Sequence, residues 1–556
     1  MKKHLALLLA VCLLFLSACK GENPGSTSGE SISSETAAVQ TVPATEPVLE
    51  GTVTWITLKG DTVLVDGTEA GTQESAVYVS RDIIYYEDKD SYESGNPYGD
   101  GEAHERHSAG EAEAHLVVNI TKPGNYRVSG ELALGQIRID LGETAKEDPT
   151  AVVNLVLDGA KITATAAPAI LFLNVYECDG GWSVDTASPD VDTAGAGANL
   201  ILAAGSENVV SGSHVAKIYK DKDGEKKLWK QDGAIYSYMS MNVAGSGSLE
   251  LHADNEGLDT ELHLTINGGD IAIYSNNDGI NTNEDGVSVT TINGGNLRIA
   301  AGLGDEGDGI DSNGYLVING GSVVATANPA SDAGLDSDLG SFINGGTVVA
   351  LGSAMDWAES DSDQVTMNLQ YDQMQSGDSA ILVTREDGRC VFAYDPGEDE
   401  ALREHLRSYC GAVISCPDFQ VGDGYHIIMG SVITGRETGG IYDAAAVTGI
   451  NSGVLQGYTG TDVMMSPGGP RPEGGMVGQN PPDLPDNGVT PPGGFTPPEG
   501  DYTIPERPGD MPQMPAGGRP GGFGGGGPGK TEELHILFYM QDKVNFFSGL
   551  TGSDTN

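Results

Sequence analysis

Short apolar segments alternate with polar turns at a nearly constant interval through the middle of the chain. The motif Ile-Asn-Gly-Gly occurs four times at intervals of 26, 26 and 25 residues, beginning at Ile266, Ile292, Ile318 and Ile343. The stretches between the motifs are brief and β-branched, such as "LTI", "LVI" and "VVAT". No window of about a dozen residues carries the i, i+3, i+4 apolar spacing of an amphipathic helix. The pattern therefore predicts an all-β fold built from repeats.

A repeat of roughly two dozen residues with three short strands and three bends is typical of a right-handed parallel β-helix. We predict such a domain over residues 51–360, in which equivalent residues of successive coils stack at about 4.8 Å. The stacking predicts an amide ladder inside one bend and two aliphatic columns inside the coils. The ladder comprises Asn267, Asn293, Asn319 and Asn344, and the columns comprise Ile266, Ile292, Ile318 and Ile343, and Leu258, Ile280, Ile310 and Leu335.

The N-terminal segment predicts export. Residues 1–19 combine a basic start with an apolar run too short for a spanning helix, as in a signal peptide. The run ends in Leu-Ser-Ala-Cys, which resembles a bacterial lipobox, so Cys19 is the predicted site of lipidation. We expect residues 20–50 to form a flexible tether. The chain is therefore expected to be a membrane-anchored lipoprotein on the extracellular face.

The C-terminal part lacks the repeat. Residues 361–431 read as strands around one sequence with helical character, "EDEALREHLRSYC", and predict a small α+β cap on the last coil. Residues 432–465 carry no clear prediction, the Pro/Gly-rich residues 466–530 are predicted to be disordered, and residues 531–556 have no evident role. Disulfides and buried free thiols are both left open for Cys178, Cys390, Cys410 and Cys416.

Net charge limits the partners. The formal net charge is −51, which argues against nucleic acid and against docking on an anionic membrane surface. Sixteen Asp and Glu residues lie between Glu250 and Gly340, and Arg298 is the only Lys or Arg between Lys230 and Arg385. We expect a monomer that touches the membrane only through its lipid.

Alignment of the coils places these acids in three columns. The columns are Asp259, Asn281, Asp311 and Asp336; Glu261, Asn283, Asn313 and Asp338; and Glu256, Asp278 and Asp308, ended by Ala333. Two carboxylates about 4.8 Å apart repel by roughly 3–4 kcal/mol at an effective dielectric of 20. A folded stack of them therefore needs a cation or wide exposure to solvent.

Calcium is the cation that this donor set predicts, because it takes six to eight oxygen ligands. The candidate ligands are Asp254, Glu256 and Asp259; Asp278, Asn281 and Asn283; Asp305, Asp308 and Asp311; and Asp332, Asp336 and Asp338. His252 and His263 lie near the first cluster only, and no cysteine lies among the ligands, so repeated zinc sites are disfavoured. The alternative is a solvated acidic edge that keeps the stack soluble.

Over about residues 52–430 the chain resembles the bacterial carbohydrate-binding-domain proteins with a pectate-lyase-like right-handed β-helix. The motifs are "GNYRVSGEL", "NLVLDGAKI", "GSENVVSG", "GAIYS", the Ile-Asn-Gly-Gly coils and "AMDWAESDSDQ". The resemblance implies a surface protein that binds cellulose and acidic sugars such as polygalacturonate. A chain this acidic should repel a polyuronate, but bound Ca²⁺ inverts the local field and can bridge protein and sugar carboxylates.

A second sugar-contacting surface is predicted in "HVAKIYKDKDGEKKLWKQ". Aromatic rings stack on sugar faces and lysines attract uronates, so the candidates are Lys217, Tyr219, Trp229 and Lys230. The alternative is a charged β-hairpin that merely projects from the stack.

Catalysis ranks below binding in this sequence. A polysaccharide lyase of this shape needs an Arg or Lys base near calcium, and Arg298 is the only candidate within the regular coils. Because the acidic motif repeats coil by coil, whereas catalytic sites are usually unique, we expect no enzymatic activity. A lyase or glycosidase and a structural or adhesive stalk remain the alternatives.

Overall fold

The computed structural model describes residues 47–87, 98–99, 103–179, 183–219, 227–461 and 533–553. The all-β prediction is confirmed, since these residues contain one short α-helix, α1 (Ala109–Ala114), and a few 3-10 turns beside many strands. The predicted signal, most of the tether, Cys19 and the Pro/Gly-rich segment lie outside the described residues. Every helix in the described part of the chain is too short or too polar to cross a lipid bilayer.

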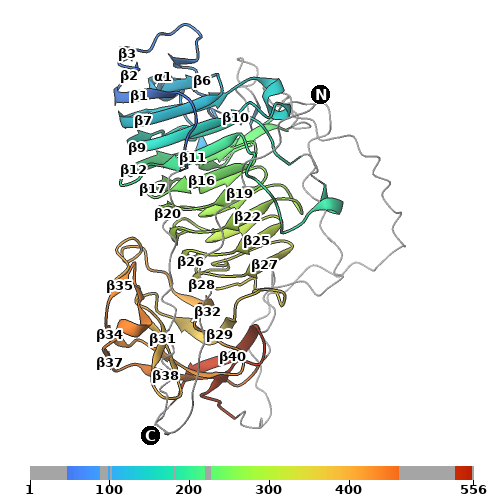
Figure 1. The fold of residues 1–556 in the computed structure, drawn as a ribbon, viewed down its shortest axis with the longest axis vertical. Helices are drawn as coiled ribbons and strands as arrows, with labels where there is room; N and C mark the ends of the chain where they lie inside the picture. The colour runs from blue at the N-terminus through green and yellow to red at the C-terminus, as the bar shows by residue number, and fades with distance from the viewer. Residues whose placement is uncertain are drawn as a thin grey trace, which may run out of the picture. The chain divides into compact units, whose positions relative to one another are not determined.

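The repeats stack as parallel ladders of strands (Figure 1), and most of them contribute one strand to each of three ladders. The first ladder comprises β1 (Val53–Gly60), β7 (Gly124–Leu132), β9 (Val153–Thr163), β11 (Ala198–Leu202), β16 (Met241–Gly245), β19 (Leu264–Ile266), β22 (Val289–Ile292), β25 (Tyr315–Ile318) and β27 (Gly340–Ile343). The second comprises the ends of β1, β7 and β9, followed by β12 (Glu207–Gly212), β17 (Ser248–Ala253), β20 (Asp270–Ser275), β23 (Asn296–Ala300), β26 (Ser322–Thr326) and β28 (Thr347–Gly352).

The third ladder positions the candidate site. It comprises β6 (Leu116–Ile120), β8 (Gly135–Asp140), β10 (Ile170–Asn174), β15 (Gly233–Ser237), β18 (Glu256–Thr260), β21 (Ile280–Thr282) and β24 (Ile310–Ser312), with the antiparallel β4 (Val77–Ser80) at its start. Successive strands of a ladder lie about one strand spacing apart. The repeat length that the sequence shows is therefore the length of one passage through all three ladders.

The interior is a continuous column of aliphatic side chains. Both predicted aliphatic columns are confirmed, because all eight residues are at most 1% exposed and lie in one core cluster. The amide ladder also forms: Asn293 donates to Asn267 at 2.9 Å, and Asn319 and Asn344 continue it. Its predicted place inside the bend is wrong, because these amides lie on the surface. Side chains alternate along a strand, so the residue after each buried isoleucine points outward.

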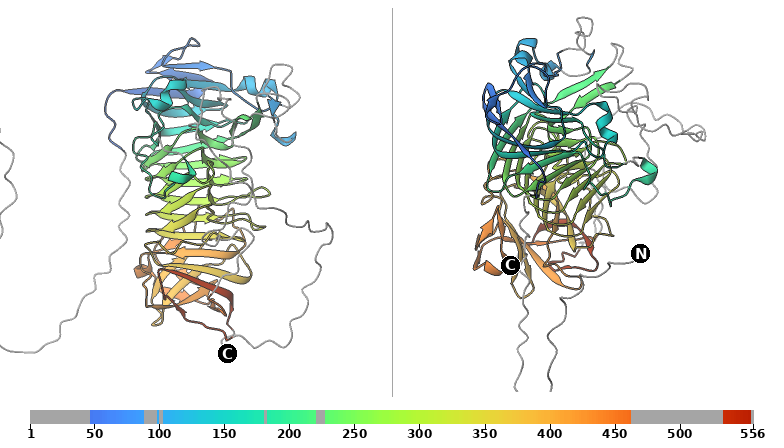
Figure 2. Two further views of the ribbon diagram at one scale, coloured as in Figure 1. Left: turned by 90° about the vertical axis from the view of Figure 1, so that its right-hand side faces the viewer. Right: turned by 45° about the horizontal axis from the view of Figure 1, so that its top comes forward.

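A mostly antiparallel cap follows the last coil (Figure 2). It comprises β29 (Thr366–Gln375), β30 (Ile381–Arg385), β31 (Cys390–Tyr394), β32 (Tyr409–Ser415), β33 (Gly424–Met429) and β38 (Val454–Gly457). Strand β32 pairs with both β28 and β29 and so covers the open edge of the second ladder. The tail adds β39 (Phe538–Tyr539) and β40 (Val544–Gly552), and β40 pairs parallel with β29. The C-terminal tail is therefore part of the cap.

The predicted cap helix is wrong. The segment between β31 and β32 forms consecutive turns, without a helix among its residues. Its residues contact the stack instead: the Tyr274 hydroxyl donates to the carbonyl of Ala401, and the guanidinium of Arg407 donates to the carbonyl of Gly302. The Ala401 carbonyl is one that a helix would use internally. All four described cysteines are free thiols.

Candidate cation site

The three predicted columns are in register on the outer side of the third ladder. Asp259 lies opposite Asn281, and Asn281 lies opposite Asp311. Backbone hydrogen bonds continue this column from Ser312 to Asp336. The column of Glu256, Asp278 and Asp308 is tied by the same kind of bond, between Gly257 and Asp278 and between Gly279 and Asp308, each 3.0 Å. Together we call Glu256, Asp259, Asp278, Asn281, Asp308, Asp311 and Asp336 the acidic file.

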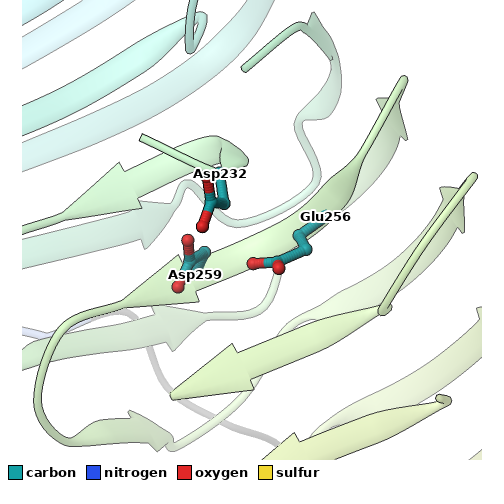
Figure 3. A group of neighbouring side chains, drawn as sticks. All are labelled: Asp232, Glu256 and Asp259. Atoms are coloured by element: carbon teal, nitrogen blue, oxygen red, sulfur yellow. The ribbon is translucent and has the colours of Figure 1, made fainter. Parts of the chain in front are cut away.

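Much of the acidic file is buried, which the sequence did not predict. Asp259 is fully buried and Glu256 is 5% exposed, although Asp259 follows the core residue Leu258 and so belongs to the opposite side of the strand. Single oxygens of Asp232, Glu256 and Asp259 all lie within 4.8 Å of one another (Figure 3). Three carboxylates therefore converge in a region with little water to screen them.

Several buried oxygens of the file lack a hydrogen-bond donor. Within the described residues, Oε2 of Glu256, Oδ2 of Asp259 and Oδ1 of Asn281 have no hydrogen-bond partner. A buried polar atom without a partner costs roughly 1–3 kcal/mol, and more if it is charged. These three atoms therefore call for a cation or a proton.

Burial also shifts the titration of the file. It raises the pKa of Glu256 to about 7, and the charge of Asp232 adds to the effect, while Lys230 opposes it. The pKa of Asp259 is likewise raised, first by burial and then by the Glu256 carboxylate. Further along, burial and Asp336 raise the pKa of Asp308 to about 8. Burial and mutual repulsion therefore make it unfavourable for all carboxyl groups of the file to be ionised at once.

Other members of the file are fixed by neighbouring amides. Asn283 donates to Oδ1 of Asp259 at 2.6 Å, and its amide oxygen accepts from the Lys230 ammonium at 2.9 Å. Asp336 accepts from the amide of Ser337 at 3.0 Å, and Asp356 accepts from the same amide and from the Ser337 hydroxyl. Asp356, which the sequence did not single out, has its pKa raised to about 8 by burial and by the charge of Asp336.

Four of the predicted ligands lie outside the buried part of the acidic file. Asp254 bonds to the hydroxyl of Ser213 at 2.6 Å and to His214 at 3.0 Å. Asp332 accepts from the backbone amide of Gly307 at 2.8 Å, at the edge of the file. Asp305 and Asp338 are exposed. The candidate ligands of a buried cation are therefore Glu256, Asp259, Asp278, Asp308 and Asp311, with their neighbouring amides.

Asp232 is the acidic residue that the sequence alignment missed. It immediately precedes Gly233, just as Glu256 precedes Gly257 and Asp278 precedes Gly279 in the later coils. The sequence shows this as an Asp-Gly pair, but in the structure Gly233 rather than Asp232 lies opposite Glu256, so the two Gly residues are one position out of register. The structure shows that this acid begins the cluster one coil earlier than the motif does.

The lysine-rich segment forms a β-hairpin, which is the alternative to a sugar-contacting surface that the sequence allows. Strand β13 (Val215–Tyr219) pairs antiparallel with β14 (Lys227–Gln231), and both belong to a separate three-stranded sheet with β5 (Tyr98–Gly99). The side chains of Lys217, Tyr219 and Trp229 lie outside the described residues. Lys230 does not project as a surface sugar contact: its ammonium lies 2.6 Å from Oδ2 of Asp232 and 2.9 Å from Oδ1 of Asn283.

Arg298 connects the second ladder to the cap through its guanidinium group. It is 5% exposed on the second ladder, and its Nε lies 3.1 Å from Oδ2 of Asp399. Its other guanidinium nitrogens donate to the carbonyls of Leu297, Ser322 and Gly439. These partners hold the arginine between a coil and the cap, on a different ladder from the acidic file. The geometry gives it a structural role.

A cleft of about 790 Å³ lies along the first strands of the third ladder, and its lining includes no member of the acidic file. Its lining includes Tyr78, Arg138, Gln231 and Tyr238, together with polar side chains of β6 and β8. Gln231 lines the cleft and directly follows Lys230, so one short segment separates the cleft from the acidic cluster. Arg138 contacts both carboxylate oxygens of Asp82 at 3.0 Å. A mixed polar and aromatic lining of this size is typical of a small-ligand or sugar site.

Comparison with known proteins finds similarity to proteins described by a carbohydrate-binding domain. A family model described as carbohydrate-binding domain-containing protein matches residues 115–179 and 183–387, which include the acidic file. A curated protein with the same description, from Acetivibrio thermocellus, is 31% identical over 157 residues, or 28% of this chain. The chain covers 44% of that relative, less than half its length. No solved structure matches the chain significantly. These matches indicate a relation to the carbohydrate-binding domain-containing proteins.

Proposed function

We propose that this chain is a surface lipoprotein that binds acidic polysaccharide, with polygalacturonate as the leading candidate, through Ca²⁺ held by the acidic file of a right-handed parallel β-helix. The observation that carries the proposal is the set of buried carboxylate and amide oxygens without donors at Glu256, Asp259 and Asn281. The three parallel ladders support the β-helix, because crossovers between parallel strands are almost always right-handed.

The residues fit calcium by their donor chemistry. Apart from the Lys230 ammonium, the side chains of the cluster offer hard oxygens, from the carboxylates of Asp232, Glu256 and Asp259 and the amides of Asn281 and Asn283. Calcium accepts carboxylate and amide oxygens together in flexible geometry. His263, by contrast, bonds to Asp179 at 3.0 Å and accepts from the Val289 amide, so it brings no nitrogen ligand.

Calcium gives the acidic file a reason to attract an anionic polymer. The bound ion supplies positive charge that protein and sugar carboxylates can share. The cleft beside Gln231 would accommodate neighbouring sugar units, with tyrosine rings and amides to contact pyranose faces and hydroxyls. A neutral polysaccharide such as cellulose would use these contacts without the ion. The Arg298 environment favours binding over a lyase reaction, because its guanidinium is committed to Asp399.

Isothermal titration calorimetry with two matched polymers tests the proposal. Polygalacturonate should bind in calcium buffer and lose its binding in EDTA, whereas fully methyl-esterified polymer should bind weakly in both. Equal binding in calcium and EDTA would remove the ionic bridge. Absorbance of unsaturated uronides in the same mixtures would instead identify a lyase, and absence of binding to any polymer on a glycan array would favour a structural stalk.

A further inference from the structure

Lys230 occupies a place that the donor set would offer to a metal ion. Its ammonium lies within hydrogen-bond distance of Oδ2 of Asp232 and Oδ1 of Asn283, with only 17% of the side chain exposed. Asn283 in turn donates to Asp259, so the ammonium lies among the converging oxygens. The lysine comes from the β13–β14 hairpin, which belongs to neither long sheet.

One ammonium does not satisfy the cluster. It has three donors, of which two are used on Asp232 and Asn283, and it carries one charge against the three carboxylates. Buried oxygens of Glu256, Asp259 and Asn281 still lack a donor with Lys230 in place. Lys230 therefore neutralises only part of the negative charge of the three carboxylates, and a second cation could neutralise the rest.

A divalent ion and the ammonium cannot use the same oxygens together. Calcium requires its ligand oxygens at about 2.3–2.6 Å, and Lys230 already contacts two of the cluster's oxygens. An ammonium and a divalent ion would also repel each other strongly in a buried site. The later part of the file, at Asp278, Asp308 and Asp311, has no corresponding lysine, since Arg298 is the only Lys or Arg that follows in the coils.

We propose that Lys230 is a tethered cation that competes with a divalent ion for the cluster of Asp232, Glu256 and Asp259. This cluster therefore binds calcium more weakly than the later part of the file. When calcium binds there, the lysine side chain is released. This inference rests on the proposed calcium site and adds its regulation. In the calcium-free protein the lysine fixes the end of the hairpin against the cluster. Calcium entry frees the ammonium, beside the cleft, where it can meet a sugar carboxylate.

The test compares two charge-matched variants by equilibrium dialysis with ⁴⁵Ca²⁺. Lys230→Met should bind calcium at the weakest class of sites at least ten-fold more tightly than the wild type. Lys161→Met removes the same charge from an exposed position on β9 and should leave all affinities within two-fold. Equal affinities in Lys230→Met and the wild type would overturn the competition while leaving the calcium proposal standing.

Amine labelling of the unmutated protein provides a readout that does not depend on a variant. Acetic anhydride should acetylate Lys230 slowly in EDTA and at least five-fold faster in saturating calcium, whereas Lys161 should react equally in both, as peptide mass mapping would show. Calcium binding without faster labelling of Lys230 would overturn the inference alone. Failure of calcium to bind either the wild type or Lys230→Met would overturn both the inference and the proposed site.

Discussion

Oδ1 of Asp278 accepts a hydrogen bond of 2.7 Å from the backbone amide of Asp308, one coil further along the stack. The carboxylate of Asp308 repeats the contact with the amide of Ala333 at 2.5 Å. Each acid is thus positioned by a backbone dipole of the next coil, which fixes its location without neutralising its charge. If a cation binds this column as proposed, its ligands are already in place before binding, and this has measurable consequences.

Stability of the calcium-free protein should fall as pH rises. The pKa of Glu256 is raised to about 7 and that of Asp308 to about 8, so their folded-state stabilisation is complete below the unfolded pKa values near 4 and is lost as pH rises through 7–8. Glu256 alone represents on the order of 3 kcal/mol, at about 1.4 kcal/mol per pKa unit. Thermal melts in EDTA from pH 5 to 8 should show a falling Tm. Calcium should raise Tm more at pH 8 than at pH 5, and a Tm that climbs with pH in EDTA would contradict the account.

Asp311→Asn should stabilise the metal-free protein and weaken calcium binding. Asn281 already occupies the same column, so an amide fits there, and repulsion of up to about 3 kcal/mol is relieved. Melts in EDTA at pH 8 should show a higher Tm, and dialysis should show at least ten-fold weaker calcium binding. Asp305→Asn, an exposed neighbour, is the control and should change neither quantity. A lower Tm for Asp311→Asn in EDTA would argue against repulsion.

Arg298→Met should loosen the cap and leave sugar binding intact. The change strands the carboxylate of Asp399, which is 1% exposed, and such a loss costs about 3–5 kcal/mol. Urea unfolding should show a lower midpoint, whereas polygalacturonate affinity of the folded variant should stay within two-fold. Arg389→Met, on an exposed cap arginine, should be nearly neutral. Loss of polymer binding in a folded Arg298→Met protein would instead show that Arg298 takes part in binding the polymer.

Gly279→Ala tests the close stacking of coils. An added Cβ would meet the side chain of Ile299 and the carbonyl of Gly309, the latter at 2.6 Å. Overpacking of this kind costs about 1–3 kcal/mol, and a backbone neighbour cannot move aside cheaply. Chemical denaturation should report that loss. Gly110→Ala, whose Cβ meets nothing within 4 Å, should be neutral or slightly stabilising, and equal stability of the two variants would contradict the packing.

The sequence predicts those features of this protein that repeat. Ile266 and Leu258 mark buried columns because the same types recur at fixed spacing, and the register of Asp259, Asn281 and Asp311 follows from that spacing. The predicted columns therefore agree with the observed pairing. The side of the bend on which Asn267 lies was not predictable from recurrence alone, since an amide ladder satisfies itself equally well inside or outside.

Contacts between distant segments were beyond the sequence pattern. Lys230 belongs to a hairpin whose charges look solvated, and only the fold brings its ammonium to Asn283, 53 residues later. The cap segment around Asp399 has helical character locally, but its carbonyls bond to side chains of the coils. Tertiary contacts thus override local propensity at the two places where other segments meet the stack.

The most direct test of the central claim is anomalous diffraction from crystals grown in calcium, and from crystals in which a lanthanide replaces it. The account predicts anomalous peaks about 2.3–2.6 Å from carboxylate oxygens of Asp278, Asp308 and Asp311. With galacturonate oligosaccharide added, a sugar carboxylate should share one of these ions. Crystals that bind the oligosaccharide with no anomalous peak along the acidic file would contradict the account.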